Sequence, residues 1–360
     1  MIFASIVVAS FLIQVYFIVW ALRGLKKLTE QPAANGKIQR QFSIIIAAHN
    51  EEKNIGKCLR LLSEQFYPDD YYEVIVAVDR CSDNTVGIVR GFQRSFPNLR
   101  IIEIQQVPVS ISPKKFAIDA AIKKARFEHL LFLDADVAPS PNHLQTMNRY
   151  FTGDTSAVVS LMKFTEPNSF WQRFLVFEKL ISWCIAGAGI GRQKPVISYG
   201  GNWGYTKTAF QIAGGFQTID HSLSGDDDLL LQKMGEAQLP VVFCLEPDGW
   251  VRTAPPKTLS HFLRQRRRHF SAGKNYRSAL QMGYFLYHVS NLILWIGWLF
   301  WKPAIILLIV KLMGDVLVVR KGNRMFREHF RSFSIILFDF LYLLYNVLIG
   351  PMGHFGRIKW

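Results

Sequence analysis

The sequence predicts an α/β domain built on a parallel sheet, with apolar helices at both ends of the chain that can cross a membrane. From residue 42 onwards, short apolar strands alternate with helical patterns, which is typical of a parallel sheet with right-handed crossovers. Uncharged apolar stretches lie at residues 2–21 and again after residue 283. One predicted strand runs directly into Asp134 and Asp136, at the sheet edge where open α/β folds bind ligands.

The composition limits the class of protein. Apolar residues make up 50% of the 360 residues, more than a soluble enzyme needs, and the formal net charge is +15. Nucleic acid, anionic lipid and a nucleotide-diphosphate substrate can each explain this charge. The Lys and Arg residues cluster beside the apolar stretches, which favours a cytosolic membrane surface over nucleic acid. The four Cys have neither metal-type nor paired spacing, which indicates reduced thiols in a cytosolic domain.

The first apolar stretch is long enough to span a bilayer, and basic residues follow it at once. A signal peptide carries its positive charge before the apolar run and a small-residue cleavage site after it, so we expect an uncleaved anchor over residues 1–27. Positive flanks stay inside, which places the following domain in the cytosol. A polar linker over residues 28–41 separates the two.

The α/β domain is expected to contain five strands and the helices between them. The strands are predicted at residues 42–48, 73–79, 99–104, 129–133 and 157–161. A helix rich in Trp and Phe over residues 170–187 either lies on the membrane surface or packs in the core. A glycine-rich loop follows at residues 199–204, where the backbone can approach a ligand closely.

Three further apolar stretches follow at residues 284–301, 304–319 and 333–350, and a tail remains at residues 351–360. We expect about three transmembrane helices, although the first two stretches are short and can instead form a re-entrant hairpin. Lys311 and Asp315 are four residues apart on one helix face, so they can pair within that helix.

Two acidic clusters carry candidate chemistry. Asp134 and Asp136 offer hard oxygen ligands that suit Mg²⁺ or Mn²⁺ held against a phosphate, although Asp is also common in turns. Asp226, Asp227 and Asp228 begin a predicted helix; capping explains one or two of them, but three adjacent like charges repel and suggest a further role.

Read together, these motifs resemble family 2 glycosyltransferases of the GT-A fold, in the order expected for that family. The resemblance covers residues 42–270 and rests on these segments: Ser43 to Glu52, Val78 to Thr85, Asp134 to Asp136, Gly200 to Asn202, Asp226 to Asp228, and Gln265-x-x-Arg268. It implies a Rossmann-like nucleotide-diphospho-sugar transferase domain over residues 42–275. The flanking apolar helices resemble those of bacterial inner-membrane members, whose catalytic domain faces the cytoplasm.

The resemblance also implies roles for single residues. A UDP- or GDP-sugar donor would meet Ala48, His49, Glu51, Asp79, Asp83, Lys114, Lys115, Asp134, Asp136, Gln265 and Arg268. Asp134 and Asp136 would also hold the Mg²⁺ or Mn²⁺ ion. A lipid-linked or glycan acceptor would meet Gly201, Asn202, Trp203 and His269. His269 stands where membrane polysaccharide synthases and ceramide-type glucosyltransferases carry a Trp that stacks on the acceptor sugar, which argues against polymer synthesis.

In this family an Asp at a helix start takes the proton of the acceptor hydroxyl. The leucine pattern assigns that role to Asp226 and the carboxylate pair assigns it to Asp227, so the sequence leaves the base open. One base without a second nucleophile implies single displacement with inversion. The alternatives are a processive polysaccharide synthase, a nucleotidyltransferase on the same fold, and a non-enzymatic membrane scaffold with a degenerate transferase domain.

Overall fold

The computed structural model describes residues 1–31, 38–108, 111–220, 222, 224–256 and 258–353. Residues 32–37 of the expected linker and residues 354–360 of the expected tail therefore lie outside the described residues. The chain forms two compact units: an α/β unit of residues 31–167 and 193–255, and a helical unit of residues 1–30, 168–192 and 256–360. The transferase domain expected over residues 42–275 thus differs from the α/β unit, because residues 168–192 and those after 255 group with the other helices.

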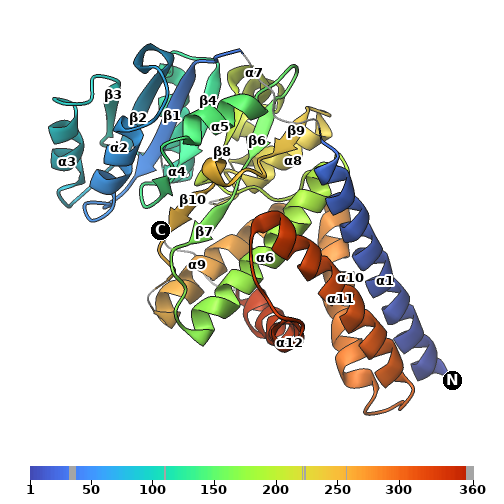
Figure 1. Cartoon of the computed structure of the whole chain (residues 1–360). Helices are drawn as coiled ribbons and strands as arrows, with labels where there is room; N and C mark the ends of the chain where they lie inside the picture. Colours follow the sequence, from blue (N-terminus) through green and yellow to red (C-terminus); the bar gives the residue numbers. More distant parts are fainter. Residues whose placement is uncertain (32–37, 109–110, 221, 223, 257, 354–360) are drawn as a thin grey trace. The chain divides into compact units, whose positions relative to one another are not determined.

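The α/β unit is built on a seven-stranded mixed sheet in the order β3-β2-β1-β4-β8-β6-β9 (Figure 1). The strands are β1 (Phe42–Ala48), β2 (Tyr72–Asp79), β3 (Leu99–Ile104), β4 (His129–Leu133), β6 (Ala157–Val159), β8 (Asn202–Thr206) and β9 (Val241–Phe243). The predicted parallel arrangement holds for β3, β2, β1 and β4. β8 runs antiparallel to both β4 and β6, so the sheet is mixed on that side.

Six α-helices and a small second sheet complete this unit. The α-helices are α2 (Ile55–Ser63), α3 (Thr85–Phe92), α4 (Pro113–Lys124), α5 (His143–Tyr150), α7 (Lys207–Ile212) and α8 (Asp228–Glu236). Short 3-10 helices lie at Asp69–Tyr71, Gly215–Ile219 and Pro247–Gly249. The second sheet has the order β5-β10-β7, from β5 (Ala138–Pro139), β10 (Val251–Thr253) and β7 (Met162–Phe164). The sequence analysis did not predict these three strands, because their two or three residues carry little pattern.

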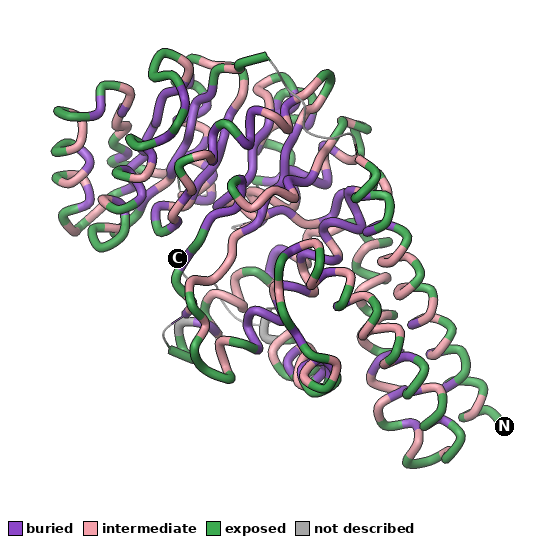
Figure 2. Tube along the Cα trace, in the orientation of Figure 1, coloured by how far each residue is buried: buried purple, intermediate pink, exposed green. Residues whose placement is uncertain are grey.

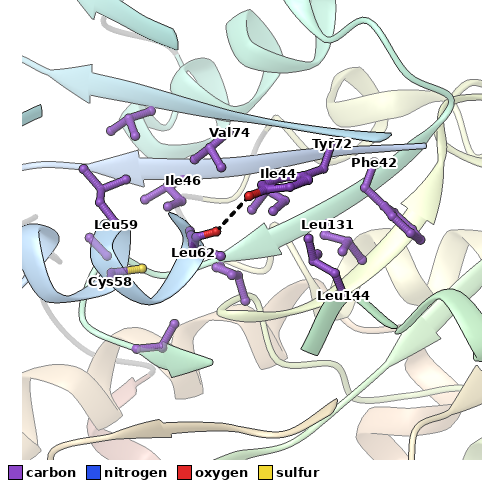
Figure 3. Close-up of a cluster of buried hydrophobic side chains, with 14 of the residues drawn as sticks. Phe42, Ile44, Ile46, Cys58, Leu59, Leu62, Tyr72, Val74, Leu131 and Leu144 are labelled. Atoms are coloured by element: carbon purple, nitrogen blue, oxygen red, sulfur yellow. Dashed lines mark hydrogen bonds between the residues drawn. The ribbon is translucent and has the colours of Figure 1, made fainter. Parts of the chain in front are cut away.

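The core lies between the central sheet and α2 (Figure 3). Ile44 and Ile46 of β1 pack with Leu59 and Leu62 of α2, and all four side chains are fully buried. β1 is flanked by β2 and β4 and buried almost throughout, which explains its continuous apolar sequence. This packing fixes the carboxyl end of β1 beside those of its two neighbours.

A buried carboxylate at the opposite end of the strands was not predicted. Glu73 accepts hydrogen bonds from the Ser43 hydroxyl at 2.7 Å, from Arg100 at 2.8 Å and from Arg126 Nε at 3.2 Å. Burial opposes ionisation, but these bonds outweigh it and lower the pKa of Glu73. The network joins β1, β2 and β3 to the segment before β4.

The described part of the helical unit contains six α-helices. They are α1 (Ile2–Thr29), α6 (Phe170–Gly191), α9 (Leu259–Ala272), α10 (Ser278–Gly297), α11 (Ala304–Phe326) and α12 (Ser332–Ile349), with 3-10 turns at Gly273–Asn275 and Gly350–Gly353. α1 and α6 approach backbone to backbone: a Cβ on Gly24 would lie 2.4 Å from the Ala188 carbonyl oxygen, and one on Gly191 would lie 2.2 Å from that of Gly24. Only glycine permits this contact.

Three of the described helices, α1, α6 and α12, are long and apolar enough to cross a membrane. The best 18-residue window of α6 is 72% buried, which fits the expectation of a core helix better than that of a surface helix. The predicted pair of Lys311 and Asp315 on α11 is confirmed at 2.6 Å. Lys311 is fully buried and also contacts Asp339 of α12 at 2.9 Å, so one ammonium group joins two helices.

Candidate active site

Lys114 joins two of the predicted acidic clusters. Its Nζ lies 3.2 Å from Asp134 Oδ1 and 3.3 Å from Asp226 Oδ2. Lys114 lies in the first turn of α4, Asp134 follows β4, and Asp226 precedes α8. The lysine side chain is 21% exposed and the two carboxylates are 36% and 13% exposed, so solvent and small ligands reach the group. The fold therefore brings together three residues that are spread over more than a hundred positions of the sequence.

The glycine-rich loop packs against these carboxylates. A Cβ on Gly201 would lie 2.4 Å from Asp134 Oδ2, and one on Gly200 would lie 3.1 Å from Asp227 Oδ2. Glycine at position 201 is thus required by the close approach of the backbone to the Asp134 side chain. The prediction that Gly201 lies beside the site is consistent with this placement.

The three Asp residues before α8 have different surroundings. Asp227 is the N-cap of α8: its Oδ1 accepts from the Asp228 amide at 2.8 Å and its Oδ2 from the Gly200 amide at 2.6 Å. Asp228 accepts from the Ser198 amide at 2.7 Å. Among the described residues, the Asp226 carboxylate instead pairs with Lys114. Asp227 and Asp228 therefore accept hydrogen bonds from backbone amides, whereas the Asp226 carboxylate is available to a ligand that displaces Lys114.

The electrostatics of Asp227 follow from this position. Burial, and after it the neighbouring charge of Asp226, raise the pKa of Asp227 to about 6, although Lys114 and the two amide donors oppose the rise. A carboxyl group in this state binds its proton more tightly than an exposed Asp. The cluster thus contains the helix-capping carboxyl group of Asp227, whose pKa is raised, next to the Asp226 carboxylate, which is paired with Lys114.

Asp136 follows Asp134 by two residues and is bonded to the second sheet. The Thr253 hydroxyl of β10 donates to Asp136 Oδ2 at 3.0 Å. Burial raises the pKa of Asp136 first of all, and the charge of Asp134 adds to it. Burial also raises the pKa of Glu51, and repulsion from the charges of Asp136 and Asp134 raises it as well. Several carboxylates thus share one sheet edge with Lys114 as a partly buried cation.

This donor set fits a divalent metal. Carboxylate oxygens are the ligands that Mg²⁺ and Mn²⁺ prefer, and the mutual repulsion of the carboxylates favours binding of a cation. Within the described ranges, no group of three or more His, Cys, Asp or Glu residues is arranged to hold a metal by itself. The residues present therefore fit an ion whose remaining ligands come from water and substrate, as is usual for Mg²⁺ beside a diphosphate.

The loops after β1 and β2 interlock. His49 Nδ1 bonds the Asp79 carbonyl oxygen at 2.6 Å, and the Glu51 amide donates to Thr85 Oγ1 at 2.8 Å. The Glu52 amide donates to Asp83 Oδ2 at 3.1 Å. These hydrogen bonds hold the loops after β1 and β2 against each other at the carboxyl edge of the sheet.

Asp79 and Asp83 were both expected to bind the donor, but their carboxylates accept hydrogen bonds from residues of these loops. Arg80 donates to both oxygens of Asp79, at 2.7 and 2.9 Å. Asp83 accepts from the Thr85 amide at 3.0 Å and from its hydroxyl at 2.5 Å. Slight desolvation opposes ionisation, but these bonds lower the pKa of Asp83. Both carboxylates therefore shape the loops, and contact with a donor would have to compete with these partners or use their free lone pairs.

Three of the predicted ligand contacts lie in the protein interior instead. Lys115 Nζ is buried and donates to the carbonyl oxygens of Ile219 at 2.6 Å and Ser222 at 2.7 Å, so it does not face a diphosphate. Asn202 is buried and donates to the Leu161 and Gly249 carbonyls at 2.7 and 3.0 Å. Trp203 is 3% exposed and packs on Phe132 and Tyr205. These side chains stabilise the segments around the site and do not line the site itself.

The remaining predicted residues are distributed between the two units. Ala48 is buried at the end of β1, and His49 is exposed directly after it. Gln265, Arg268 and His269 belong to α9 of the helical unit. On that helix Arg266, which was not predicted, pairs with Glu178 of α6 at 2.5 Å. Thr253 was also missed, because a single Thr in a three-residue strand carries no pattern that marks it.

A mixed sheet with a lysine between two carboxylates at its carboxyl edge, and with the interlocked loops of β1 and β2 beside it, agrees with the GT-A fold expected from the sequence and places a ligand site at that edge. The sequence matches the family description "Glycosyl transferase family group 2" over residues 129–351 and "Glycosyl transferase family 2" over residues 43–212. The first match covers more than half of the chain. The protein therefore belongs to family 2 of the glycosyltransferases, and it is a glycosyltransferase enzyme.

Known proteins agree with this assignment. The chain is 32% identical over 130 residues to the glycosyltransferase AglE of Haloferax volcanii, covering 35% of this chain and 40% of that protein. It is 26% identical over 174 residues to the beta-monoglucosyldiacylglycerol synthase of Synechocystis, covering 44% of this chain and 36% of that one. The matches span less than half of these relatives. The fold resembles that of the mannosyltransferase PcManGT from Pyrobaculum calidifontis, solved with GDP-Man and Mn²⁺, with a TM-score of 0.60, 17% identity and coverage of 98% and 96%.

Proposed function

We propose that this protein is a membrane-anchored, inverting glycosyltransferase that moves a sugar from a nucleotide-diphospho-sugar to a hydroxyl group of a lipid-linked or glycan acceptor. The observation that carries the proposal is the position of Lys114 between Asp134 and Asp226. It places a cation suited to a donor phosphate next to a carboxylate suited to act as a base.

On the donor side, Lys114 offsets the negative charge of the diphosphate, which a compact ammonium group does without a fixed fork geometry. Asp134 and Asp136 would hold a divalent metal, which when bound stabilises the charge of the departing nucleoside diphosphate. Thr253 keeps Asp136 oriented through its hydroxyl. The solved complex of PcManGT with GDP-Man and Mn²⁺ supports a donor and metal of this class.

On the acceptor side, we propose Asp226 as the base, because Asp227 and Asp228 are committed to backbone amides. The Asp226 carboxylate takes the acceptor proton while the acceptor oxygen bonds the anomeric carbon and the bond to the diphosphate oxygen breaks. The nucleoside diphosphate leaves with the electron pair of that bond. One displacement with no enzyme-bound intermediate inverts the anomeric configuration.

The membrane placement rests on the apolar helices. α1, α6 and α12 have the length and composition of membrane spans, and basic residues follow the apolar part of α1. We propose that the α/β unit lies on the cytoplasmic side of a bacterial inner membrane, with α10 and α11 spanning it or forming a re-entrant hairpin. The acceptor is then supplied from the membrane or from a growing glycan.

The test uses the full chain, purified in detergent, with a panel of UDP- and GDP-sugars and release of the nucleoside diphosphate as the readout. We expect release with one donor class, its loss in excess chelator, and its loss in Asp136→Asn. Asp119→Asn serves as the control, because Asp119 pairs with Lys123 along α4 and takes no part in the site. No release with any donor in the presence of Mg²⁺ and Mn²⁺, or full activity of Asp136→Asn, would contradict the proposal.

A further inference from the structure

α1 and the end of α6 form a groove of about 320 Å³ within the helical unit, called here the α1–α6 groove. Its apolar part is made by α1 residues that include Leu12 and Val19, and its basic part by Arg23 of α1 and Arg192 after α6. Tyr16 belongs to the apolar part, and Trp20 lies between Val19 and Arg23 on α1. None of the residues of the candidate active site lines this groove, so glycosyl transfer does not account for it.

The basic part carries uncompensated positive charge. Within the described part of the chain, no carboxylate pairs with Arg23 or Arg192, although both line the same groove. The Arg192 guanidinium lies over the Trp20 ring at 5.9 Å, and its buried Nε has no hydrogen-bond partner. A buried donor without a partner is uncommon in native proteins, and two guanidinium groups around one space favour an anion between them.

The backbone holds the two arginines in place. Arg23 precedes Gly24 and Arg192 follows Gly191, and these two glycines make the close contact between the helices. The backbone positions of the two arginines are therefore set by this close packing of α1 against α6. Fixing the two backbones lowers the entropic cost of binding one anion with both side chains.

The groove has the length of one membrane leaflet. Leu12 and Arg23 are eleven residues apart on α1, which corresponds to about 16 Å along the helix, close to half of the hydrocarbon thickness. Its apolar part is open, with Leu12 60% and Tyr16 63% exposed. Exposed positions, drawn in green, recur along α1 in Figure 2. Aromatic residues and arginines at the end of a span are typical of the headgroup level.

We propose that the α1–α6 groove binds an anionic glycerophospholipid of the surrounding bilayer. Its phosphate lies between Arg23 and Arg192, and one acyl chain lies along the exposed apolar face of α1. The inference rests on the proposed membrane placement of α1, but it does not depend on the transfer reaction. A phospholipid suits the site better than a lipid acceptor does, since no candidate base lines the groove.

The experiment is native mass spectrometry of the full chain in detergent, with phosphatidylglycerol or phosphatidylcholine of the same chain length. We expect the wild type to retain phosphatidylglycerol in preference to phosphatidylcholine. Arg23→Gln or Arg192→Gln should each reduce this preference about fivefold, and the double variant should reduce it by the product of the two factors. Lys26→Gln is the matched control, because Lys26 is an exposed basic residue of α1 that does not line the groove. The Arg23→Lys/Arg192→Lys variant keeps both charges and should retain most of the preference.

Two results would overturn the proposal. One is equal retention of the two lipids, or an equal loss in Lys26→Gln. The other is retention of a polyprenyl phosphate in preference to phosphatidylglycerol, lost in the double variant, which would assign the groove to an acceptor. Release of nucleoside diphosphate from the donor, measured on the same samples, shows separately whether the proposed transfer reaction holds.

Discussion

The Lys114 ammonium group lies 3.3 Å from the Asp226 carboxylate, although the two residues come from the start of α4 and the segment before α8. The same ammonium group lies 3.2 Å from Asp134. A donor diphosphate that binds Lys114 would compete with these carboxylates for it. Donor binding and release of Asp226 for the acceptor are therefore expected to be linked at this one side chain.

Replacing Lys114 should weaken donor binding most. We expect Lys114→Gln to raise the dissociation constant of the nucleoside diphosphate about 10- to 100-fold, the range of a charge-assisted hydrogen bond. Lys114→Arg keeps the charge and should recover part of the affinity. Isothermal titration calorimetry on the three proteins measures this, and an unchanged constant in Lys114→Gln would remove Lys114 from the donor site.

Thr253 should act through Asp136. Thr253→Val keeps the shape of the side chain but removes the hydroxyl that donates to Asp136 Oδ2. We expect about 10- to 100-fold weaker Mn²⁺ affinity in the presence of nucleoside diphosphate, as for other groups that orient a metal ligand. Thr253→Ser keeps the donor and should bind Mn²⁺ nearly as the wild type does. Equal affinities in Thr253→Val and the wild type would show that this hydroxyl is dispensable.

Lys115 is expected to position the segment that leads to Asp226, through its bonds to the Ile219 and Ser222 carbonyls. Lys115→Met should lower kcat by up to about 100-fold through misplacement of that segment, with little change in nucleotide affinity. Burial lowers the pKa of Lys115 to about 8, so the wild type should lose kcat above this pH and the variant should lack that limb. Lys124→Met, on the exposed last turn of α4, is the control, and loss of nucleotide affinity in Lys115→Met would contradict the positioning role.

Asp227 should make the free energy of unfolding depend on pH, and its raised pKa fixes the sign of that dependence. The folded protein keeps this proton at pH values where the unfolded chain has lost it, so the contribution to stability is full below 3.8 and is lost as the pH rises to about 6. Asp227→Asn should remove this dependence and cost about 1 kcal/mol of stability by losing one acceptor. Thermal unfolding followed between pH 4 and 7 tests it. A slope that persists unchanged in Asp227→Asn would assign the effect to another group.

The sequence was sufficient where local pattern and strand position decide the outcome. The apolar runs of β1, β2, β3 and β4 correctly predicted four parallel strands, and the carboxylates that follow β4 were correctly placed at the carboxyl edge of the sheet. The order of the motifs was enough to identify the family. These features depend on residues that are near one another in the sequence.

The sequence was insufficient where packing decides which of two neighbours faces the ligand. Lys114 and Lys115 are adjacent on α4 and point about 100° apart, so only one of them can reach the site. The register follows from the burial of Lys115 against Ile219 and Ser222, contacts more than a hundred residues away. Asn202 was interpreted as part of a ligand loop, but it begins β8, because pairing with β4 is a long-range property.

The most direct test of the account compares Asp226→Asn with Asp227→Asn, measuring glycosyl transfer and nucleoside-diphosphate binding in both. We expect Asp226→Asn to lose transfer by about 10²- to 10⁴-fold, the usual scale of general-base catalysis, while it still binds the nucleotide. Asp227→Asn should keep most of its transfer activity at a temperature where it is folded. Near wild-type transfer by Asp226→Asn, or a greater loss in Asp227→Asn at full folding, would contradict the assignment of Asp226 as the base.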